Sequence, residues 1–377
     1  MNILIFSHQV AGHHIEYMHH LYEEAQNRQG NSFFFLTSKE YVLNKDIYKW
    51  ERSTNTKFIF LTDEEQRQAD SKNQLEAAWF MSKILRRYTI KYQIDHVFLL
   101  WFIGLMPFLP FFLKKRISIS GILYRIYLYK ENELSWSRLF LERIRFWIIS
   151  HSNKIKAVCV LNDENGASEL NKRFVTGKFI YLPDPLPIID KKHLKNIRKE
   201  LNIDVSNTIY LHFGALEERK GTLEILKAIN NSDSKSLQNK AFVFAGRVGK
   251  DIRDEFYETV KSVEKKATIK VIDRFCENEL LFNLCYSCNC ILIPYFNTIQ
   301  SSGVLGYAAF FCKPVIGPNQ DLLGRLIESN ELGITLSDVT AQGLERALRE
   351  PLPEIKSNYI LTHRIEEFNN VIFKQII

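Results

Sequence analysis

Short apolar runs alternate with longer amphipathic stretches along most of the chain. The first run covers residues 2–7, and a glycine-containing loop and an amphipathic stretch over 14–25 follow it. Strands that alternate with helices predict a parallel sheet covered by helices on both faces. Further strands are expected at 32–36, 57–61, 96–100, 117–123 and 156–161, with long helices at 64–88 and 134–149.

A proline-rich segment interrupts this alternation at residues 181–190. Pro183, Pro185 and Pro187 cannot continue a helix or a central strand, so we interpret the segment as a linker between domains. After it the alternation resumes. Strands are expected at 208–213, 241–245, 268–272, 290–294 and 314–316, and helices at 220–229, 250–265, 277–286, 302–311 and from 355 onward.

This pattern predicts an α/β protein built from two doubly wound halves that face each other across a cleft. We expect an N-terminal domain of residues 1–183, a second domain of residues 184–354, and a C-terminal helix over 355–377 that packs back toward the first domain. A length of 377 residues agrees with two or three domains.

The composition excludes a disordered, fibrous or disulfide-stapled protein. The chain is 46% hydrophobic and 25% charged, and its six cysteines show no even spacing. Cys285, Cys288 and Cys290 suggest zinc, but no second pair of ligands accompanies them, so we expect small buried side chains and no metal. The N-terminus lacks the basic start of a signal peptide, and we expect a cytoplasmic protein.

The net charge of +7 is concentrated in residues 97–160, which hold ten basic and three acidic side chains. The uncharged run 97–113 would reach only about 25 Å as a helix, and prolines break it, so it does not span a bilayer. The basic triplet 114–116 and the aromatic, basic stretch 136–147 suggest contact with anionic lipid at the inner membrane face. The alternatives are a buried helix with a solvated basic face and, without a supporting motif, nucleic acid.

Three glycine-containing segments are expected at the carboxyl edge of the second sheet. The first runs from Phe213 to Gly221 and includes Lys220, the second is Gly246-Arg247, and the third is Ser301-Ser302-Gly303 before a helix. Backbone amides, two cations and a helix start at one edge suit phosphate oxygens. Taken singly, each segment could also be a tight turn or a simple helix cap.

These residues resemble a known family. Gly214 with Lys220-Gly221, the Gly246 turn, Ile293-Pro294, Ser302-Gly303 and the segment Lys313-Pro314-Val315-Ile316 look like the C-terminal Rossmann-like domain of GT-B glycosyltransferases, nearest to glycosyltransferase family 4. The resemblance implies a nucleoside diphosphate-sugar donor whose diphosphate is held by Lys220 and by the serine-glycine turn, with the nucleobase near 274–276. The donor-binding residues it implies are Gly214, Arg219, Gly246, Phe275, Ser301, Ser302 and Gly303.

The sequence departs from the family pattern at two places. Ala215 stands where the family commonly has an arginine, and we expect Arg219 or Arg247 to substitute for its charge. The family's two glutamates are replaced by Ile299 and Tyr307. The ribose contact must then be made by other residues, and the choice between retention and inversion stays open.

Sugar transfer needs stabilisation of a leaving diphosphate and an activated acceptor hydroxyl. We expect Lys220 and Arg247 to supply the first without a metal or cofactor. An inverting reaction also needs a general base, for which His14 is the catalytic candidate, although a structural histidine is the alternative. The expected acceptor-binding residues are Gly12, His13, Ser120 and Arg125.

The sequence therefore predicts a glycosyltransferase that moves a sugar from a nucleoside diphosphate-sugar to a glycan or lipid-linked saccharide, in cell-surface polysaccharide synthesis. One alternative is a non-catalytic partner protein of the same fold that binds a nucleotide-sugar. A second alternative is a GT-B enzyme that acts on nucleic acid.

Overall fold

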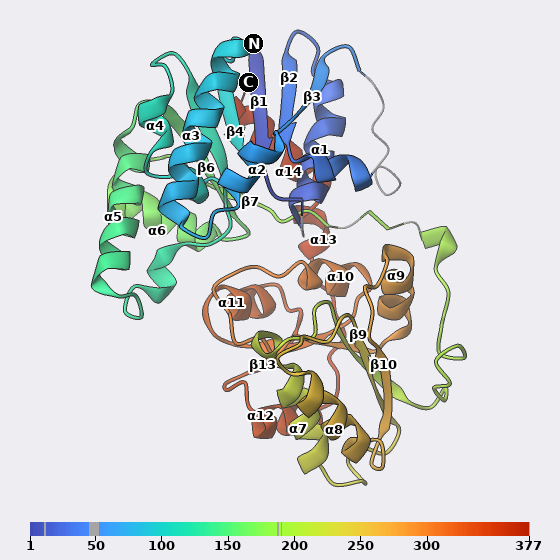
Figure 1. Cartoon of the computed structure of the whole chain (residues 1–377). Helices are drawn as coiled ribbons and strands as arrows, with labels where there is room; N and C mark the ends of the chain where they lie inside the picture. Colours follow the sequence, from blue (N-terminus) through green and yellow to red (C-terminus); the bar gives the residue numbers. More distant parts are fainter. Residues whose placement is uncertain (11–12, 45–52, 187, 190, 377) are drawn as a thin grey trace. The chain divides into compact units, whose positions relative to one another are not determined.

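The computed structural model describes residues 1–10, 13–44, 53–186, 188–189 and 191–376. The chain divides into two compact units, shown in Figure 1. The first unit contains Met1–Pro183 and Ile365–Ile377, and the second contains Asp184–Arg364. The second unit thus extends past residue 354, where we expected it to end.

The first unit is built on a seven-stranded sheet in which all neighbouring strands are parallel. The strand order is β3-β2-β1-β4-β5-β6-β7. The order therefore reverses between β1 and β4. The strands are β1 Asn2–Ser7, β2 Ser32–Thr37, β3 Thr56–Phe60, β4 His96–Leu99, β5 Ser118–Leu123, β6 Ile155–Leu161 and β7 Phe179–Leu182.

Successive side chains of β1 enter two different hydrophobic cores because they point to opposite faces of the sheet. Leu4 and Phe6 belong to one core and Ile3 and Ile5 to the other. The helices of this unit are α1 His13–Gln26, α2 Asp63–Ala69, α3 Gln74–Lys91, α4 Leu109–Phe112, α5 Trp136–His151, α6 Glu164–Phe174 and α14 Ile365–Ile376.

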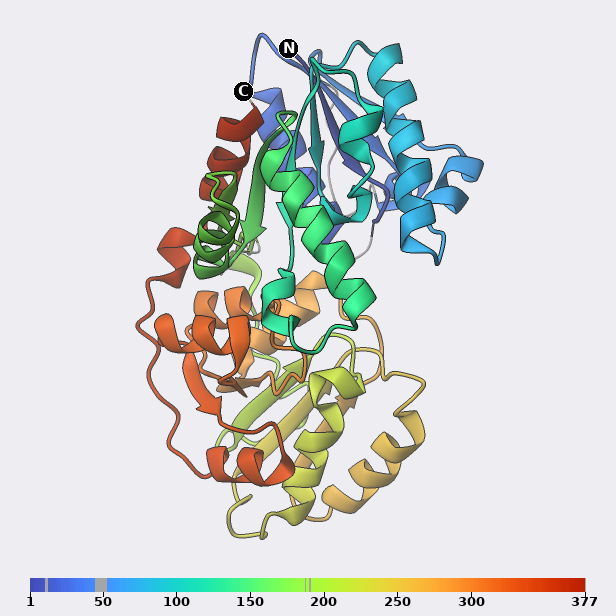
Figure 2. The ribbon, with the colours of Figure 1, turned by 90° about the vertical axis from the view of Figure 1, so that its left-hand side faces the viewer.

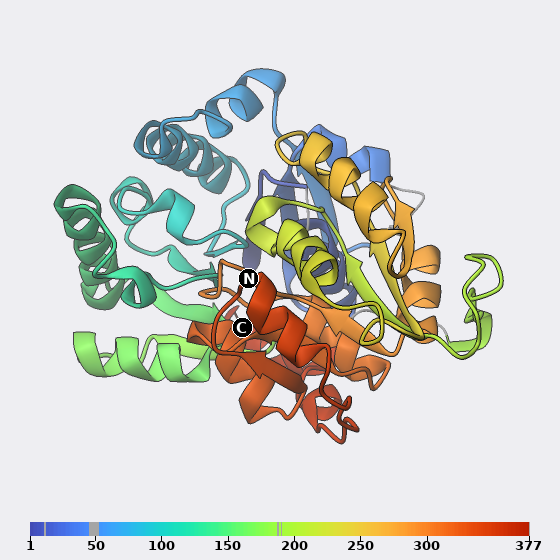
Figure 3. The ribbon, with the colours of Figure 1, turned by 90° about the horizontal axis from the view of Figure 1, so that it is seen from below.

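The C-terminal helix α14 completes the second of these cores. The Phe368 ring lies 4.9 Å from Tyr17 of α1, and the Phe373 ring lies 5.7 Å from Phe33 of β2. On the other side of the unit, α5 and α6 lie next to each other at its outer edge (Figures 2 and 3). Among the described residues, no helix is both long enough and apolar enough to cross a bilayer.

The second unit is built on a six-stranded parallel sheet of order β10-β9-β8-β11-β12-β13. Its strands are β8 Thr208–Phe213, β9 Lys240–Ala245, β10 Thr268–Ile272, β11 Cys290–Leu292, β12 Val315–Pro318 and β13 Gly333–Leu336. Its helices are α7 Thr222–Asn231, α8 Arg253–Val263, α9 Asn278–Ser287, α10 Val304–Phe310, α11 Asp321–Ser329, α12 Ala341–Ala347 and α13 Tyr359–Thr362. Two doubly wound parallel sheets confirm the predicted α/β class, and in this unit the order reverses between β8 and β11.

Two expected helices are each divided in the structure. The pattern over 64–88 breaks into α2 and α3, because α2 ends at Ala69 and the Asn73 side chain accepts hydrogen bonds from the first amides of α3. The expected C-terminal helix is divided into α13 and α14, which belong to different units. The pattern also missed β7, β13, α6, α11 and α12.

Candidate functional site

Two glycine turns lie against each other at the carboxyl ends of β8 and β9. Gly214 has a φ of +97° and Gly246 a φ of +147°, and both angles favour glycine. A Cβ at Gly246 would lie 1.6 Å from the Gly214 carbonyl oxygen, and a Cβ at Gly214 would lie 2.7 Å from Lys220 Nζ. The absence of these side chains lets both backbones and the Lys220 ammonium meet at one point.

A third glycine ties this turn to the end of β11. Gly221 ends a short 3₁₀ turn with a φ of +67°, and a Cβ there would lie 2.1 Å from the Pro294 carbonyl oxygen. The Phe296 amide donates to the Arg219 carbonyl oxygen at 3.0 Å. The loops after β8, β9 and β11 therefore meet where the strand order reverses, which is where doubly wound sheets bind ligands.

The Lys220 ammonium is partly buried at this meeting point. Its Nζ lies 5.3 Å from the centroid of the Tyr295 ring. The pKa of Lys220 is lowered to about 8, mainly by burial and to a smaller extent by the Arg219 guanidinium, while Glu217 opposes the shift. Lys220 remains mostly protonated at pH 7, so the site holds a cation that a bound anion would stabilise.

The two arginines of this region differ in their surroundings. Arg219 Nε lies 2.6 Å from Glu217 Oε2, so part of its charge is already compensated. Arg247 follows β9 with an exposed side chain, and its carbonyl oxygen accepts from the Leu216 amide at 2.9 Å. Its backbone therefore lies at the edge where the sequence predicted it.

The Ser301-Ser302-Gly303 turn differs from the expected helix start. The helix α10 begins at Val304, two residues later than expected, and Gly303 rather than Ser302 is its N-cap. Ser301 Oγ donates to Oδ2 of Asp184 at 3.3 Å, and Asp184 is buried. Sequence reasoning did not single out Asp184, because it lies among the linker prolines.

The two positions of the missing glutamates are filled by hydrophobic packing. Ile299 is buried. Tyr307 lies with its ring 5.6 Å from Phe213 and 6.1 Å from Phe282. Hydrophobic and aromatic packing therefore occupies both positions at which the resemblance leads us to expect glutamates.

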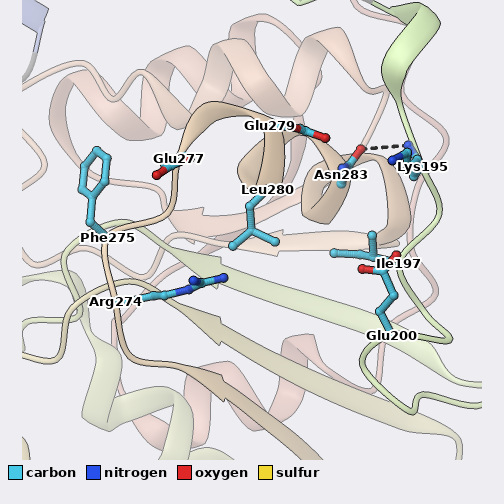
Figure 4. A pocket seen from close by; sticks show the side chains of 9 residues that line it. All are labelled: Lys195, Ile197, Glu200, Arg274, Phe275, Glu277, Glu279, Leu280 and Asn283. Atoms are coloured by element: carbon cyan, nitrogen blue, oxygen red, sulfur yellow. Dashed lines mark hydrogen bonds between the residues drawn. The ribbon is translucent and has the colours of Figure 1, made fainter. Parts of the chain in front are cut away.

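A pocket of about 280 Å³ lies beside the carboxyl end of β10 and under α9 (Figure 4). The Arg274 side chain extends toward Leu280, and the Phe275 ring points away from them and is 67% exposed. The pocket also has three carboxylates in its wall, which disfavour phosphate but accept hydrogen bonds from hydroxyl and amino groups. These carboxylates belong to Glu200, Glu277 and Glu279.

In the first unit, His14 is oriented by Ser7 at the carboxyl end of β1. The Ser7 hydroxyl donates to the Gln9 carbonyl oxygen at 3.0 Å and lies 3.2 Å from His14 Nδ1. The Ser7 hydroxyl has a single hydrogen, which it donates to the Gln9 carbonyl oxygen. The hydrogen bond between Ser7 and His14 therefore has Nδ1–H of His14 as the donor and Ser7 Oγ as the acceptor, and in the neutral ring Nε2 is left as an acceptor. Burial lowers the pKa of His14 to about 4, with smaller effects from His8 and His13, so the ring is neutral at pH 7.

Sequence reasoning missed His8 and two aromatic residues, one next to His8 and one next to His14. His8 is buried with its ring 5.5 Å from Trp101, and burial lowers its pKa to about 4 against the opposing charge of Asp70. The ring of Tyr124 lies 5.3 Å from His14. Trp101 and Tyr124 follow the ends of β4 and β5, and this position at strand ends was the signal that could have revealed them.

The other expected acceptor residues have different outcomes. Gly12 lies outside the described residues. His13 is half-exposed with Nδ1 3.7 Å from Glu16 Oε2, and Arg125 is exposed after the end of β5. The prediction for Ser120 was wrong, because β5 continues past it and its buried hydroxyl is bonded to His96 Nε2 at 2.7 Å.

Comparison with known proteins gives matches only among solved structures. No protein-family model and no curated protein matches the chain. The chain is similar to WaaG, a glycosyltransferase involved in lipopolysaccharide biosynthesis, with a TM-score of 0.66, 12% identity and coverage of 98% of this chain and 94% of WaaG. It is similar to HepE of Anabaena in complex with UDP and glucose, with a TM-score of 0.69, 13% identity and coverage of 99% and 98%.

A third similar structure is an α,α-trehalose-phosphate synthase (UDP-forming) from Burkholderia xenovorans in complex with glucose-6-phosphate. Its TM-score is 0.70 at 11% identity, and the match covers 100% of this chain and 99% of that one. The fold is GT-B. At these identities the likeness establishes the architecture of the chain, and the loops after β8, β9 and β11 of this GT-B fold contain the glycines and Lys220 described above. Among the described residues, no group of three or more histidine, cysteine, aspartate or glutamate side chains is placed to hold a metal.

Proposed function

We propose that this protein is a glycosyltransferase of the family 4 type. In this proposal it moves a sugar from a nucleoside diphosphate-sugar to a glycan or lipid-linked saccharide, in the cytoplasm at the inner membrane face, during cell-surface polysaccharide synthesis. The observation that carries the proposal is the Lys220 ammonium against Gly214, at the point where the strand order of a GT-B sheet reverses. HepE, whose structures contain UDP and UDP-glucose, supports uridine nucleotides as the first donors to test.

The second unit supplies groups for the departing diphosphate. When the bond from the sugar to the diphosphate breaks, negative charge develops on the leaving oxygen, and Lys220 is placed to stabilise it. Arg247 is an exposed second cation at the same edge. One preorganised donor of this kind contributes roughly a hundred- to a thousandfold to the rate. In this proposal the two cations stabilise the departing diphosphate without a metal or cofactor.

The pocket under α9 suits the nucleoside part of the donor. Phe275 offers an exposed ring for stacking, and the neighbouring carboxylates can accept hydrogen bonds from ribose hydroxyls. Such acceptors would replace the missing family glutamates, whose positions are filled by Ile299 and Tyr307.

The first unit supplies groups for the acceptor. Neutral His14, held by Ser7 with Nε2 as an acceptor, can take the proton of an attacking hydroxyl in an inverting reaction. The rings of Trp101 and Tyr124 offer surfaces for a saccharide, and His13 and Arg125 stay as proposed contacts.

The proposal is tested by titrating the protein with uridine, UMP and UDP, followed by the other nucleoside diphosphates, in the presence of EDTA. We expect UDP or another diphosphate to bind at least about tenfold more tightly than its monophosphate, because the second phosphate reaches Lys220. Lys220→Met should remove that difference and leave monophosphate binding unchanged. Equal affinity for monophosphate and diphosphate in the wild type contradicts the proposal.

The hydrophobic filling at Ile299 and Tyr307 favours a second candidate, a non-catalytic partner protein that binds a nucleotide-sugar. A turnover assay across a panel of nucleotide-sugars separates the two functions. Release of the nucleoside diphosphate, with or without an added saccharide acceptor, supports the enzyme. Tight binding of the intact donor with no release supports the partner protein.

A further inference from the structure

The exposed face of α5 is an aromatic and basic stripe. Trp136, Phe140, Arg143, Trp147 and His151 are all exposed. Their spacing of four, three, four and four residues places them on one side of the helix, along about 22 Å of its length. In Figures 1 and 2 this helix lies at the outside of the first unit.

The rings of this stripe are large and strongly exposed. Trp136 is 79% exposed, Phe140 54% and Trp147 58%. Trp136 stacks on Phe140 with a ring distance of 5.6 Å, and Trp147 stacks on His151 at 4.8 Å. Each pair thus offers a continuous apolar surface to the surroundings, a feature that marks interaction sites.

A groove of about 670 Å³ joins the end of this stripe to α4. Phe111, Lys115, Trp147 and His151 contribute to its wall, and Phe111 is 73% exposed. The Lys154 ammonium donates to the Pro110 and Leu113 carbonyl oxygens, which holds the α4 segment next to the end of α5. The two aromatic segments therefore form one surface.

The charge of this surface is positive. Lys114, Lys115 and Arg116 follow α4 and are all exposed. Among the residues of α5, all of which the structure describes, no exposed side chain is a carboxylate. The carboxylate Glu142 of this helix is half-buried, with Oε1 2.6 Å from Arg145 Nη1.

We propose that this α4–α5 surface, defined by Phe111, Lys114, Lys115, Arg116, Trp136, Phe140 and Trp147, docks on an anionic phospholipid bilayer. Helix α5 lies in the plane of the membrane, with its rings at the boundary between headgroups and acyl chains and the cations on lipid phosphates. The charge excess of residues 97–160 is complementary to an anionic surface. Duplex nucleic acid would also attract the cations, but its bases are stacked inside the helix, so it offers no apolar layer for a stripe of stacked indole and phenyl rings. The proposal does not depend on the proposed transferase activity.

The test is co-sedimentation of the full chain with vesicles of phosphatidylcholine alone and of equimolar phosphatidylcholine and phosphatidylglycerol, at physiological ionic strength. Wild-type protein should pellet with the anionic vesicles and stay in the supernatant with the neutral ones. A variant with Lys114→Glu, Lys115→Glu and Arg116→Glu should bind at least about tenfold more weakly, because each cation contributes to the attraction. The matched control reverses Lys235, Lys261 and Lys265, which are exposed in the second unit, and should bind almost like the wild type.

A second variant, with Trp136→Ser, Phe140→Ser and Trp147→Ser, tests insertion of the rings. It keeps every charge and replaces only exposed side chains, so the fold should survive, which circular dichroism checks. Brominated anionic vesicles should quench tryptophan fluorescence in the wild type, and the serine variant should lose that quenching together with at least about tenfold of its binding.

Equal recovery of the wild type with and without anionic vesicles overturns the proposal. It is also overturned if both charge variants weaken vesicle binding equally, because net charge alone would then explain the binding. Tight binding to duplex DNA or RNA that is lost in the Lys114/Lys115/Arg116 variant, with no vesicle binding, would assign the surface to nucleic acid instead.

Discussion

The partly buried charge of Lys220 lowers the free energy of unfolding of the protein without ligand, and substitution of this one residue can measure that loss. Lys220→Met removes the ammonium but keeps an unbranched side chain of similar length. We expect the variant to be more stable than the wild type without ligand, because burial disfavours the charged form of Lys220. The same variant should bind a nucleoside diphosphate roughly ten- to a hundredfold more weakly, as one charge-assisted contact is lost.

The size of the stability change follows from the pKa. Lowering the pKa from 10.5 to about 8 corresponds to about 3 kcal/mol at about 1.36 kcal/mol per unit. Solvent screening of a side chain that is only partly buried reduces this to about 1–2 kcal/mol. The folded-state pKa is the lower one, so the cost is fully present below pH 8 and is relieved as the pH rises toward 10.5. At pH 10 about a quarter of it should remain.

The assay is urea unfolding of the wild type and the variant at pH 7 and pH 10, followed by circular dichroism. Tryptophan fluorescence would not serve, because all five tryptophans lie before residue 148 and therefore in the first unit. Lys227→Met is the matched control. Lys227 lies on α7 with Nζ 3.3 Å from Glu224, so its loss should destabilise the protein slightly. A Lys220→Met variant that is no more stable than the wild type at pH 7, or equally stabilised at both pH values, would refute the reasoning.

Three further predictions concern the fold and the acceptor side. Gly246→Ala should destabilise the second unit by about 2–4 kcal/mol in a circular-dichroism unfolding experiment, because the new Cβ would overlap the Gly214 carbonyl oxygen. Gly177→Ala is the control, because Gly177 has open space around it, and it should change stability by less than about 0.5 kcal/mol. His14→Gln should lower turnover by roughly a hundred- to ten-thousandfold with donor affinity unchanged in a nucleotide titration, and a drop below tenfold would remove His14 as the base. Glu65→Gln should destabilise the first unit by about 1–3 kcal/mol, because the buried Glu65 carboxylate pairs with Arg87. Unfolding followed by tryptophan fluorescence measures this change, and an unchanged midpoint would show that the pair contributes nothing to stability.

The sequence predicted the strands near the site because their apolar runs are continuous and glycine follows them. The turn from Gly214 to Gly221 and the turn at Gly246 lie where the pattern placed them. Hydrophobic periodicity is weaker in short elements, and β13, with four residues, gives almost no pattern of its own. This strand forms because it pairs in parallel with β12, and a pairing between distant segments cannot be recognised from the hydrophobic pattern of a short stretch of sequence.

The side-chain partners at the candidate sites could not be predicted for a similar reason. The sequence places Ser120 at a strand end next to glycine, but β5 continues, because Gly121 still pairs with Leu99 of β4. The Ser120 hydroxyl is bonded to His96 on the same neighbouring strand. The prolines around Asp184 predict a linker residue, and its hydrogen bond with Ser301 could not be expected because the two residues are far apart in the sequence. Contacts of this kind depend on the tertiary fold rather than on local spacing.

The chain passes from one unit to the other twice, and this makes the second unit an insertion within the first. The ends of the insertion are tied together, because the Leu186 amide donates to the His363 carbonyl oxygen at 2.9 Å. In the first unit, α14, which follows the insertion, lies against β6 and against β7, which precedes it. We therefore expect that residues 184–364 can be removed as one continuous piece and replaced by a short glycine-rich bridge without opening the first core. Stopping the chain at residue 183 should instead strip Phe368 and Phe373 from that core and leave an apolar face open to aggregation.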